Sequence, residues 1–110
     1  MTGAVHGSAV PVYPGARLTD IMGGNYYDEI GGAVTFTSRS WFFSTGDPVA
    51  KVAEFYRKNL PEGARHVQAD DGEVAFEWIP AGAVRGEEVN ISLREGQIQI
   101  GETVQAKGKA

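Results

Sequence analysis

One segment near the middle of the chain, residues 45–61, has a clear helical period. Its apolar residues recur on one side and form a stripe of Val49, Val52, Ala53, Tyr56 and Leu60, which Phe55 widens. Asp47 is a good N-cap, and Pro48 suits the first helical position, where a missing N–H costs nothing. Pro61 predicts the stop. We therefore expect a helix over about 47–60, which must rest on a surface because so short a helix is marginal alone.

Strands and turns are expected around this helix. Alternating apolar and polar residues predict strands at 33–37, 41–45, 65–69, 73–79, 88–94 and 97–104. A single bent strand from 33 to 45 is the alternative for the first two, because Ser38-Arg39 is poor chemistry for a two-residue turn. Tight turns are expected at 70–72 and at 95–96. The order strand, strand, helix and four strands predicts an α+β fold, with one helix on one face of a mostly antiparallel sheet of five or six strands.

Residues 10–32 fit several structures. Two prolines in residues 10–16 predict an extended edge segment that ends in a Pro-Gly turn, with Val12 and Tyr13 packed on the domain edge. Residues 17–22 fit one helical turn or a short extended piece. Paired glycines on both sides of residues 25–30 predict a loop or a wide hairpin tip.

Composition bounds the domain and its partners. The 110 residues predict a single domain at 10–104, with flexible tails at 1–9 and 105–110. A net charge of −4 and dispersed basic residues argue against a nucleic-acid surface. Since no apolar run approaches about 18 residues, we expect no membrane span. The chain has no cysteine, which excludes disulfides, thiolate metal sites and cysteine nucleophiles.

Few residues have the chemistry of a catalytic or metal site. His6 lies in the N-terminal tail, His66 lies in a weak strand, and the chain has no Gly-x-Ser-x-Gly elbow. Asp20, Asp28 and Glu29 lie near the glycines, but their spacing matches no Ca²⁺ loop. We therefore expect no catalytic residue, no cofactor and no metal, and interpret the chain as a non-enzyme.

Two features are candidate contact sites. Tyr26, Tyr27 and Asp28 lie between paired glycines and resemble a recognition loop, because tyrosine offers a large contact area at little cost in entropy. The alternative is that one tyrosine lies in the core and the other on the surface. Phe42 does not fit the alternation of its strand, so it is expected either to cover the second face of the sheet or to mark an exposed contact patch.

The expected sheet is wider than the single helix that would cover it, and the uncovered part of its apolar face is where we expect a functional contact. Five or six strands make a sheet roughly 20–25 Å wide, whereas a helix with its side chains covers about 10–12 Å. The rest of the apolar face must be covered by residues 10–32, by curling of the sheet, or by a partner. That partner would be another protein, a second copy of the chain, or a small molecule in a pocket between helix and sheet.

The chain contains the motif Tyr13-Pro14-Gly15-Ala16, then a strand that leads through Thr45-Gly46-Asp47-Pro48 into the helix, and then Val52-Ala53-Glu54-Phe55-Tyr56. Together these features resemble a loose group of uncharacterised bacterial domains. These domains are often exported or lipid-anchored. The resemblance covers roughly residues 10–104 and implies no activity. It implies an extracytoplasmic, envelope-associated interaction module; without it, the start of the chain would fit a cytoplasmic protein. The alternative function is a small-molecule binding protein or weak enzyme.

Overall fold

The computed structural model describes residues 10–28, 34–61, 63–68, 73–80, 82–83 and 86–105. In chain order the elements are β1 (Arg17–Asp28), β2 (Val34–Ser44), α2 (Val49–Asn59), β3 (Arg65–Gln68), β4 (Val74–Trp78), β5 (Glu88–Arg94) and β6 (Gln97–Gln105). The predicted α+β class, with one described helix and an antiparallel sheet, is confirmed. The number of strands on each side of the helix also matches, but both strands predicted before the helix lie within β2, and β1 was not predicted as a strand.

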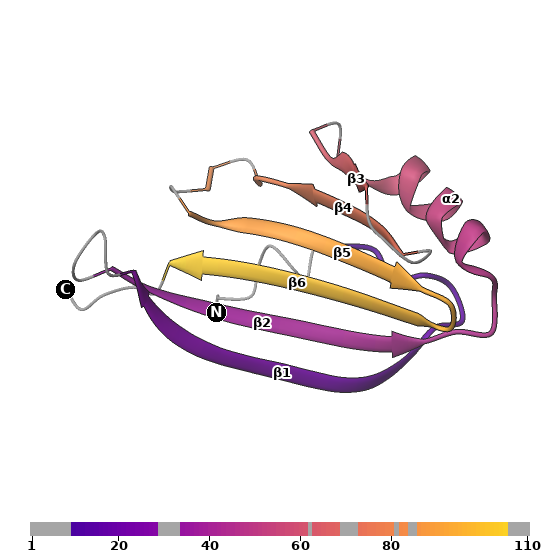
Figure 1. Ribbon diagram of the computed structural model, residues 1–110, viewed down its shortest axis with the longest axis horizontal. Coiled ribbons are helices and arrows are strands. Elements are labelled where there is room, and N and C mark those ends of the chain that lie inside the picture. The colour runs from indigo at the N-terminus through magenta and orange to yellow at the C-terminus, as the bar shows by residue number, and fades with distance from the viewer. Residues whose placement is uncertain are drawn as a thin grey trace.

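All the strands belong to one sheet, in the order β1-β2-β6-β5-β4-β3, and every neighbouring pair is antiparallel. Figure 1 shows β1 and β3 at the two edges and β6 beside β5 in the middle. The turn between these two central strands is tight, because Arg94 pairs directly with Gln97 and only two residues connect them. Gly96 supplies the positive φ of 82° that this turn requires.

One face of the sheet carries the core. The ladders place Ile91 between Phe76 and Ile100, and Leu93 between Val74 and Ile98, so apolar side chains are neighbours across several strands. From the helix, Val52, Ala53 and Tyr56 are buried against this face. The stripe predicted from the helical period is therefore the buried side of α2, with Val49 and Leu60 partly buried at its ends.

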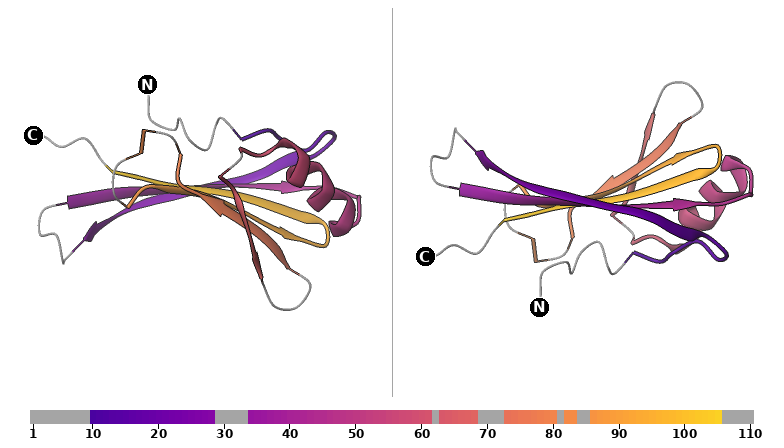
Figure 2. Two further views of the ribbon diagram at one scale, coloured as in Figure 1. Left: turned by 90° about the horizontal axis from the view of Figure 1, so that it is seen from above. Right: turned by 90° about the horizontal axis from the view of Figure 1, so that it is seen from below.

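The helix covers only one end of this face. Figure 2 shows α2 on one side of the sheet, over the end where β2 and β5 finish. Residues 10–16, here called the N-terminal strap, also contribute to the core, because Val10 and Tyr13 are buried in it. The strap thus provides part of the internal cover that the size mismatch requires. Val12 does not pack as expected, since 48 % of it is exposed.

The helix begins later than predicted. Its first residue is Val49, and its N-cap is Pro48, which has extended φ and ψ and makes no side-chain capping bond. The expectation that Asp47 caps the helix is wrong, because its carboxylate binds a tyrosine and a lysine instead. The end at Asn59 agrees with a stop before Pro61.

The first two strands also differ from the leading interpretation. Residues 34–44 form one continuous strand, so the alternative of a single strand is the correct one and Ser38-Arg39 makes no turn. Residues 17–28, interpreted as a helical turn or short extended piece followed by a loop, form a twelve-residue edge strand instead. The glycines at 23 and 24 lie inside this strand, paired with Arg39 and Ser38.

The remaining boundaries shift by one or two residues, which is the usual uncertainty at the ends of elements. The predicted turn at 70–72, residues 29–33, and the tails at 1–9 and 106–110 lie outside the described residues. Gln105, expected to begin the C-terminal tail, is the last residue of β6. Of the residues that the structure describes, none belongs to a helix with the length and apolar character needed to cross a bilayer.

Candidate functional site

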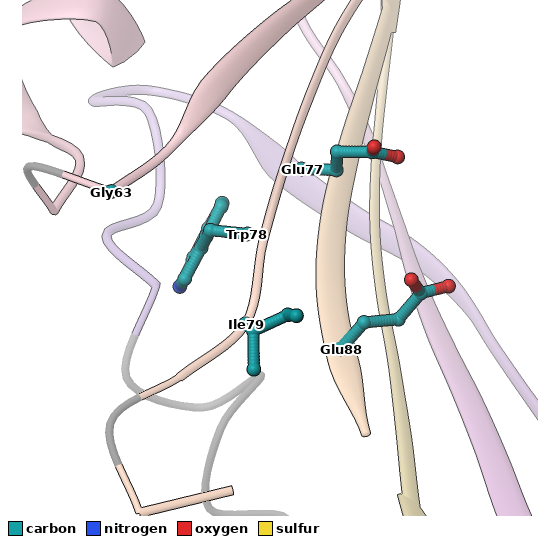
Figure 3. Close-up of a pocket in the computed structure, with 5 residues that line it drawn as sticks. All are labelled: Gly63, Glu77, Trp78, Ile79 and Glu88. Carbon is teal, nitrogen blue, oxygen red and sulfur yellow. The ribbon is translucent and has the colours of Figure 1, made fainter. Parts of the chain in front are cut away.

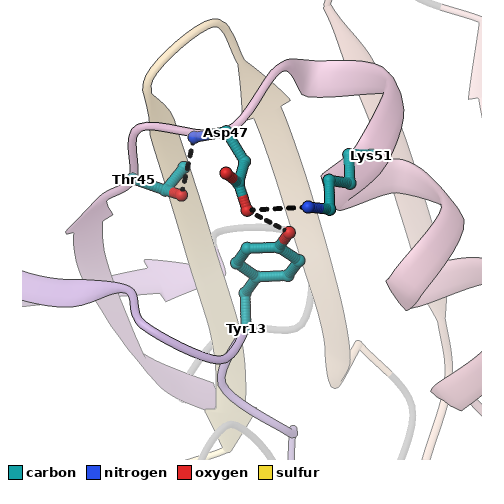
Figure 4. Close-up of polar contacts among 4 residues, drawn as sticks. All are labelled: Tyr13, Thr45, Asp47 and Lys51. Carbon is teal, nitrogen blue, oxygen red and sulfur yellow. Dashed lines mark hydrogen bonds and ion pairs between the residues drawn. The ribbon is translucent and has the colours of Figure 1, made fainter.

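A polar cluster surrounds the start of α2 (Figure 4). The Tyr13 hydroxyl donates a 2.5 Å hydrogen bond to Oδ2 of Asp47, and Nζ of Lys51 lies 3.8 Å from the same oxygen. The backbone N–H of Asp47 donates to Oγ1 of Thr45 at 3.2 Å. The carboxylate therefore links the strap to the first turn of the helix.

Both tyrosines that join the strap to the helix are kept protonated. The hydrogen bond to Asp47, together with burial and the charge of that carboxylate, raises the pKa of Tyr13. Burial raises the pKa of Tyr56 to about 12, against the opposing effect of a backbone hydrogen bond from Tyr13. The Tyr56 hydroxyl donates to the carbonyl of Pro11 at 2.8 Å. A phenol with a raised pKa is poorly matched to proton transfer near neutral pH. These two hydroxyls therefore serve as hydrogen-bond donors that hold the strap against the helix and the segment before it.

Two hollows lie near β4. The first, of about 310 Å³, is lined by Gly63, Glu77, Trp78, Ile79 and Glu88. Figure 3 shows the two glutamates pointing to one side of the strands and Trp78 to the other. The two carboxylates therefore lie on the opposite side of the strands from the Trp78 ring, so the residues that line this hollow do not converge on one point.

The second hollow, of about 400 Å³, lies between α2 and the sheet, where the alternative ligand pocket is expected. It is lined by Tyr56, Arg57, Leu60, Pro61, Ala64, His66 and Phe76. The exposed ring of His66 lies 5.6 Å from the ring of Phe76. An apolar lining with two polar groups, the imidazole of His66 and the guanidinium of Arg57, has the composition of a binding groove.

Three of the five large apolar side chains that are exposed among the described residues lie in the edge strand β1. Leu18, Ile21 and Met22 are 49 %, 53 % and 56 % exposed, and are here called the edge strip. Leu18 and Ile21 pair with Phe43 and Trp41, so they lie on the helix-side face; Met22 lies on the opposite face. The strip therefore presents apolar groups on both faces of one sheet edge.

The backbone of this edge is also open. The N–H of Ile21 donates to Oδ1 of its neighbour Asp20 at 2.9 Å, and we interpret it as directed away from β2. In an antiparallel strand, successive residues direct their N–H and C=O groups to opposite sides. Ile21 and, two residues on, Gly23 therefore direct their backbone groups away from the sheet, as an incoming strand requires.

The predicted recognition residues belong to this same strand. Tyr26, Tyr27 and Asp28 pair with Phe36, Thr35 and Val34, so their backbone extends the sheet instead of forming a loop over it. Phe42 pairs with Asp20 and Gln99 on the face away from the helix, where it is partly buried. Met22 is its diagonal neighbour, which brings the predicted aromatic next to the edge strip.

The sequence-based search missed the edge strip and one buried carboxylate. Residues 17–22 fitted either a helical turn or a short extended piece, and without a strand assignment the exposure of Leu18, Ile21 and Met22 could not be inferred. Glu102 is only 4 % exposed and lies on the core face, directly between Arg39 and Val89. Its position among core residues follows from the alternation of β6, and the opposite charge of Arg39 across the ladder suits it.

Among the described residues, no group of three or more potential ligands could hold a metal ion. No protein-family model, curated protein or solved structure matches this chain.

Proposed function

We propose that this chain works as a non-enzymatic interaction module and binds a protein partner by adding a strand to the free edge of β1. The observation that carries the proposal is the edge strip, with three large apolar side chains about half exposed on one edge strand. Proteins usually protect such an edge with lysine, proline or a short strand, because it invites pairing with another chain.

The two edges of the sheet differ in this respect. β3 has four residues, whereas β1 has twelve and contains neither lysine nor proline. Near the start of β1, a register shift between Leu18 and Asp20 interrupts the edge, and the Asp20 carboxylate accepts the N–H of Ile21. An added strand would supply main-chain hydrogen bonds, and the strip would supply apolar contacts on both faces.

A matched pair of variants tests this proposal. Ile21→Lys places a charge on the edge strip, whereas Ile79→Lys makes the same change at an isoleucine that is 73 % exposed outside β1. A photoreactive benzoylphenylalanine at Met22 should give cross-linked products in an extract of the source cells, and Ile21→Lys should remove them while Ile79→Lys does not. The same probe at exposed Ala50 on α2 is the background control. Products equal to those at Ala50 would refute the proposal.

The resemblance to exported bacterial domains adds an extracytoplasmic or envelope-associated setting to the proposal. Fractionation of the source cells followed by immunodetection tests this setting. Recovery in the cytosolic fraction alone would contradict it and would leave the interaction proposal standing.

The groove between α2 and the sheet favours a second candidate, a small-molecule binding protein or weak enzyme. Its lining includes the completely buried Tyr56 and the exposed His66. A binder should shift the backbone amide resonances of His66 and Ala64 in a titration with a library of small apolar acids, because both residues line the groove. Unchanged resonances across the library would remove this candidate.

A further inference from the structure

We propose that the partner on the β1 edge is a second copy of this chain, paired β1 to β1 in antiparallel fashion about a two-fold axis at Gly23. This inference rests on the proposed function, because it takes β1 as the contact edge and specifies what occupies it. The pairing would join two six-stranded sheets into one continuous sheet.

Alternation along the strand restricts the registers. In a continuous antiparallel sheet, residues that lie opposite each other point to the same face. A two-fold axis perpendicular to the sheet must therefore pass beside a residue rather than between two residues. Ile21, Gly23 and Asn25 alternate with the residues that face β2, so their backbone groups are directed toward the copy, and the Ile21 N–H would exchange its bond to Asp20 for one to the copy.

The axis at Gly23 is the register that charge favours. It places Ile21 opposite Asn25 and Asp20 opposite Tyr26. The extra residue of the β1 bulge, between Leu18 and Asp20, then brings Arg17 opposite Asp28. The two-fold axis produces this ion pair twice, and opposite charges across an antiparallel ladder are favourable.

Neighbouring registers lack this complementarity. An axis at Gly24 places Asp20 opposite Asp28, which sets like charges against each other twice. An axis at Met22 pairs Arg17 with Tyr26 and leaves the last residues of the strand without partners. The register at Gly23 uses the whole strand from Arg17 to Asp28 and forms opposite charge pairs.

The same register gives the exposed apolar residues neighbours. Leu18 lies opposite Tyr27 of the copy, which is a favourable aliphatic–aromatic pair. Met22 lies opposite Gly24, where the missing side chain leaves room for the long Met side chain. Tyr27, one of the residues that suggested a recognition loop, thus lies at the register position opposite Leu18 in the edge strip of the copy.

Single cysteines test the register directly, because the natural chain has none. In Gly23→Cys the two residues lie opposite each other, at a Cα separation of about 5.5 Å for a hydrogen-bonded pair, within the range that a disulfide spans. In Ile21→Cys the two cysteines lie four positions out of register, roughly 13 Å apart along the strand. Under oxidised glutathione we expect a disulfide-linked dimer to form at least about tenfold faster with Gly23→Cys. Equal rates, or a faster Ile21→Cys, would overturn the proposal.

A Cβ on Gly23 would lie 3.1 Å from the carbonyl oxygen of Ser38, so Gly23→Cys could shift the backbone of β1 or β2. A second variant therefore tests the register with Gly23 left unchanged. The double variant Ile21→Cys with Asn25→Cys should give dimers linked by two disulfides. Within one chain these two positions are four residues apart on an extended strand and cannot join. Monomers alone from this variant would also overturn the register.

Sedimentation velocity over a dilution series tests the dimer without cysteines. The natural chain should show a reversible monomer–dimer equilibrium, which Ile21→Lys abolishes and Ile79→Lys retains. Arg17→Asp or Asp28→Arg should each weaken the dimer about tenfold, since two favourable pairs become repulsive, and the double reversal should restore it.

A monomer at every concentration would overturn the second copy as partner. If the Met22 cross-linking probe then still gave an adduct of another mass, the interaction module would stand with a different partner.

Discussion

Two buried tyrosines hold the N-terminal strap to the rest of the molecule. Tyr13 reaches the carboxylate of Asp47, and Tyr56 reaches the carbonyl of Pro11, so each hydroxyl joins segments that are far apart in sequence. The rings of Tyr13 and Tyr56 both lie edge-on against Phe55, with centroids 5.3 and 5.0 Å away. The strap is therefore bound by aromatic packing and by two phenolic hydrogen bonds.

The Tyr56 hydroxyl predicts a loss of stability at alkaline pH. Its pKa is about 12 in the folded chain, compared with about 10 when unfolded. The folded state thus binds this proton more tightly, and the resulting stability is present below pH 10 and is lost between pH 10 and pH 12. Tyr56→Phe should cost about 1 kcal/mol at pH 7, because the Pro11 carbonyl loses its donor.

Urea unfolding at several pH values measures both effects. The difference in midpoint between the natural chain and Tyr56→Phe should shrink steadily as pH rises from 10 to 12. A constant difference over that range would show that Tyr56 does not carry the alkaline sensitivity.

Gly86 predicts a second effect of a single residue. A Cβ at this position would lie 2.6 Å from Cζ of Phe36, and its φ is +93°. Gly82 has a similar φ of +79° but has no atom within 4 Å of such a Cβ. Both Gly→Ala changes should cost about 1–2 kcal/mol from backbone strain. Gly86→Ala should cost a further ~1–3 kcal/mol from overpacking against Phe36.

Thermal unfolding of the two alanine variants separates strain from packing. Similar losses in both would mean that the ring of Phe36 moves aside without cost. We expect instead that Gly86→Ala unfolds at the lower temperature of the two.

At the scale of elements, the strands with regular alternation were predictable and the first hairpin was not. Residues 88–94 alternate strictly, because every second side chain faces the core, and the predicted bounds match β5. In β1 no such pattern exists, since the strand lies at an edge with both faces partly in solvent. Its glycines at 23 and 24 were interpreted as loop residues, although Gly23 fits closely against the backbone of Ser38 in the paired strand.

The start of the helix was mispredicted for a related reason. Asp47-Pro48 has the local chemistry of a cap, but the carboxylate gains a hydrogen bond from Tyr13, 34 residues away. A local rule cannot anticipate a partner supplied by the tertiary fold. The candidate site follows the same logic, because the exposure of Ile21 and Met22 depends on which strand ends the sheet.

The strap predicts an unequal response of two adjacent residues. Tyr13 is buried against Phe55, whereas Val12 points to solvent. Tyr13→Ala should therefore lower the urea midpoint clearly, and Val12→Ala should change stability by no more than about 0.5 kcal/mol. Equal effects of the two variants in parallel urea titrations would mean that the strap does not belong to the cooperative core.

At the scale of the whole molecule, the helix and the strap cover the core face of the sheet unequally. The helix and the strap cover the core face over β5 and its neighbours, and β1 lies outside that cover. The central strands β5 and β6 contain residues that are 0–2 % exposed, including Ile91, Leu93 and Ile98. The molecule thus has a well-buried centre and an edge with exposed apolar side chains.

This asymmetry predicts the pattern of native-state hydrogen exchange. Amides in the β5–β6 ladder should exchange only through global unfolding, because both strands are paired on each side. Amides of the four-residue edge strand β3 should exchange through local opening, at a lower free energy. In β1, the outward N–H groups of Ile21 and Gly23 should exchange rapidly in dilute samples and slow down as concentration rises, because pairing with a second copy would bury them. Exchange at these two amides that is independent of concentration, in samples shown by sedimentation to contain dimer, would place the interface on another surface.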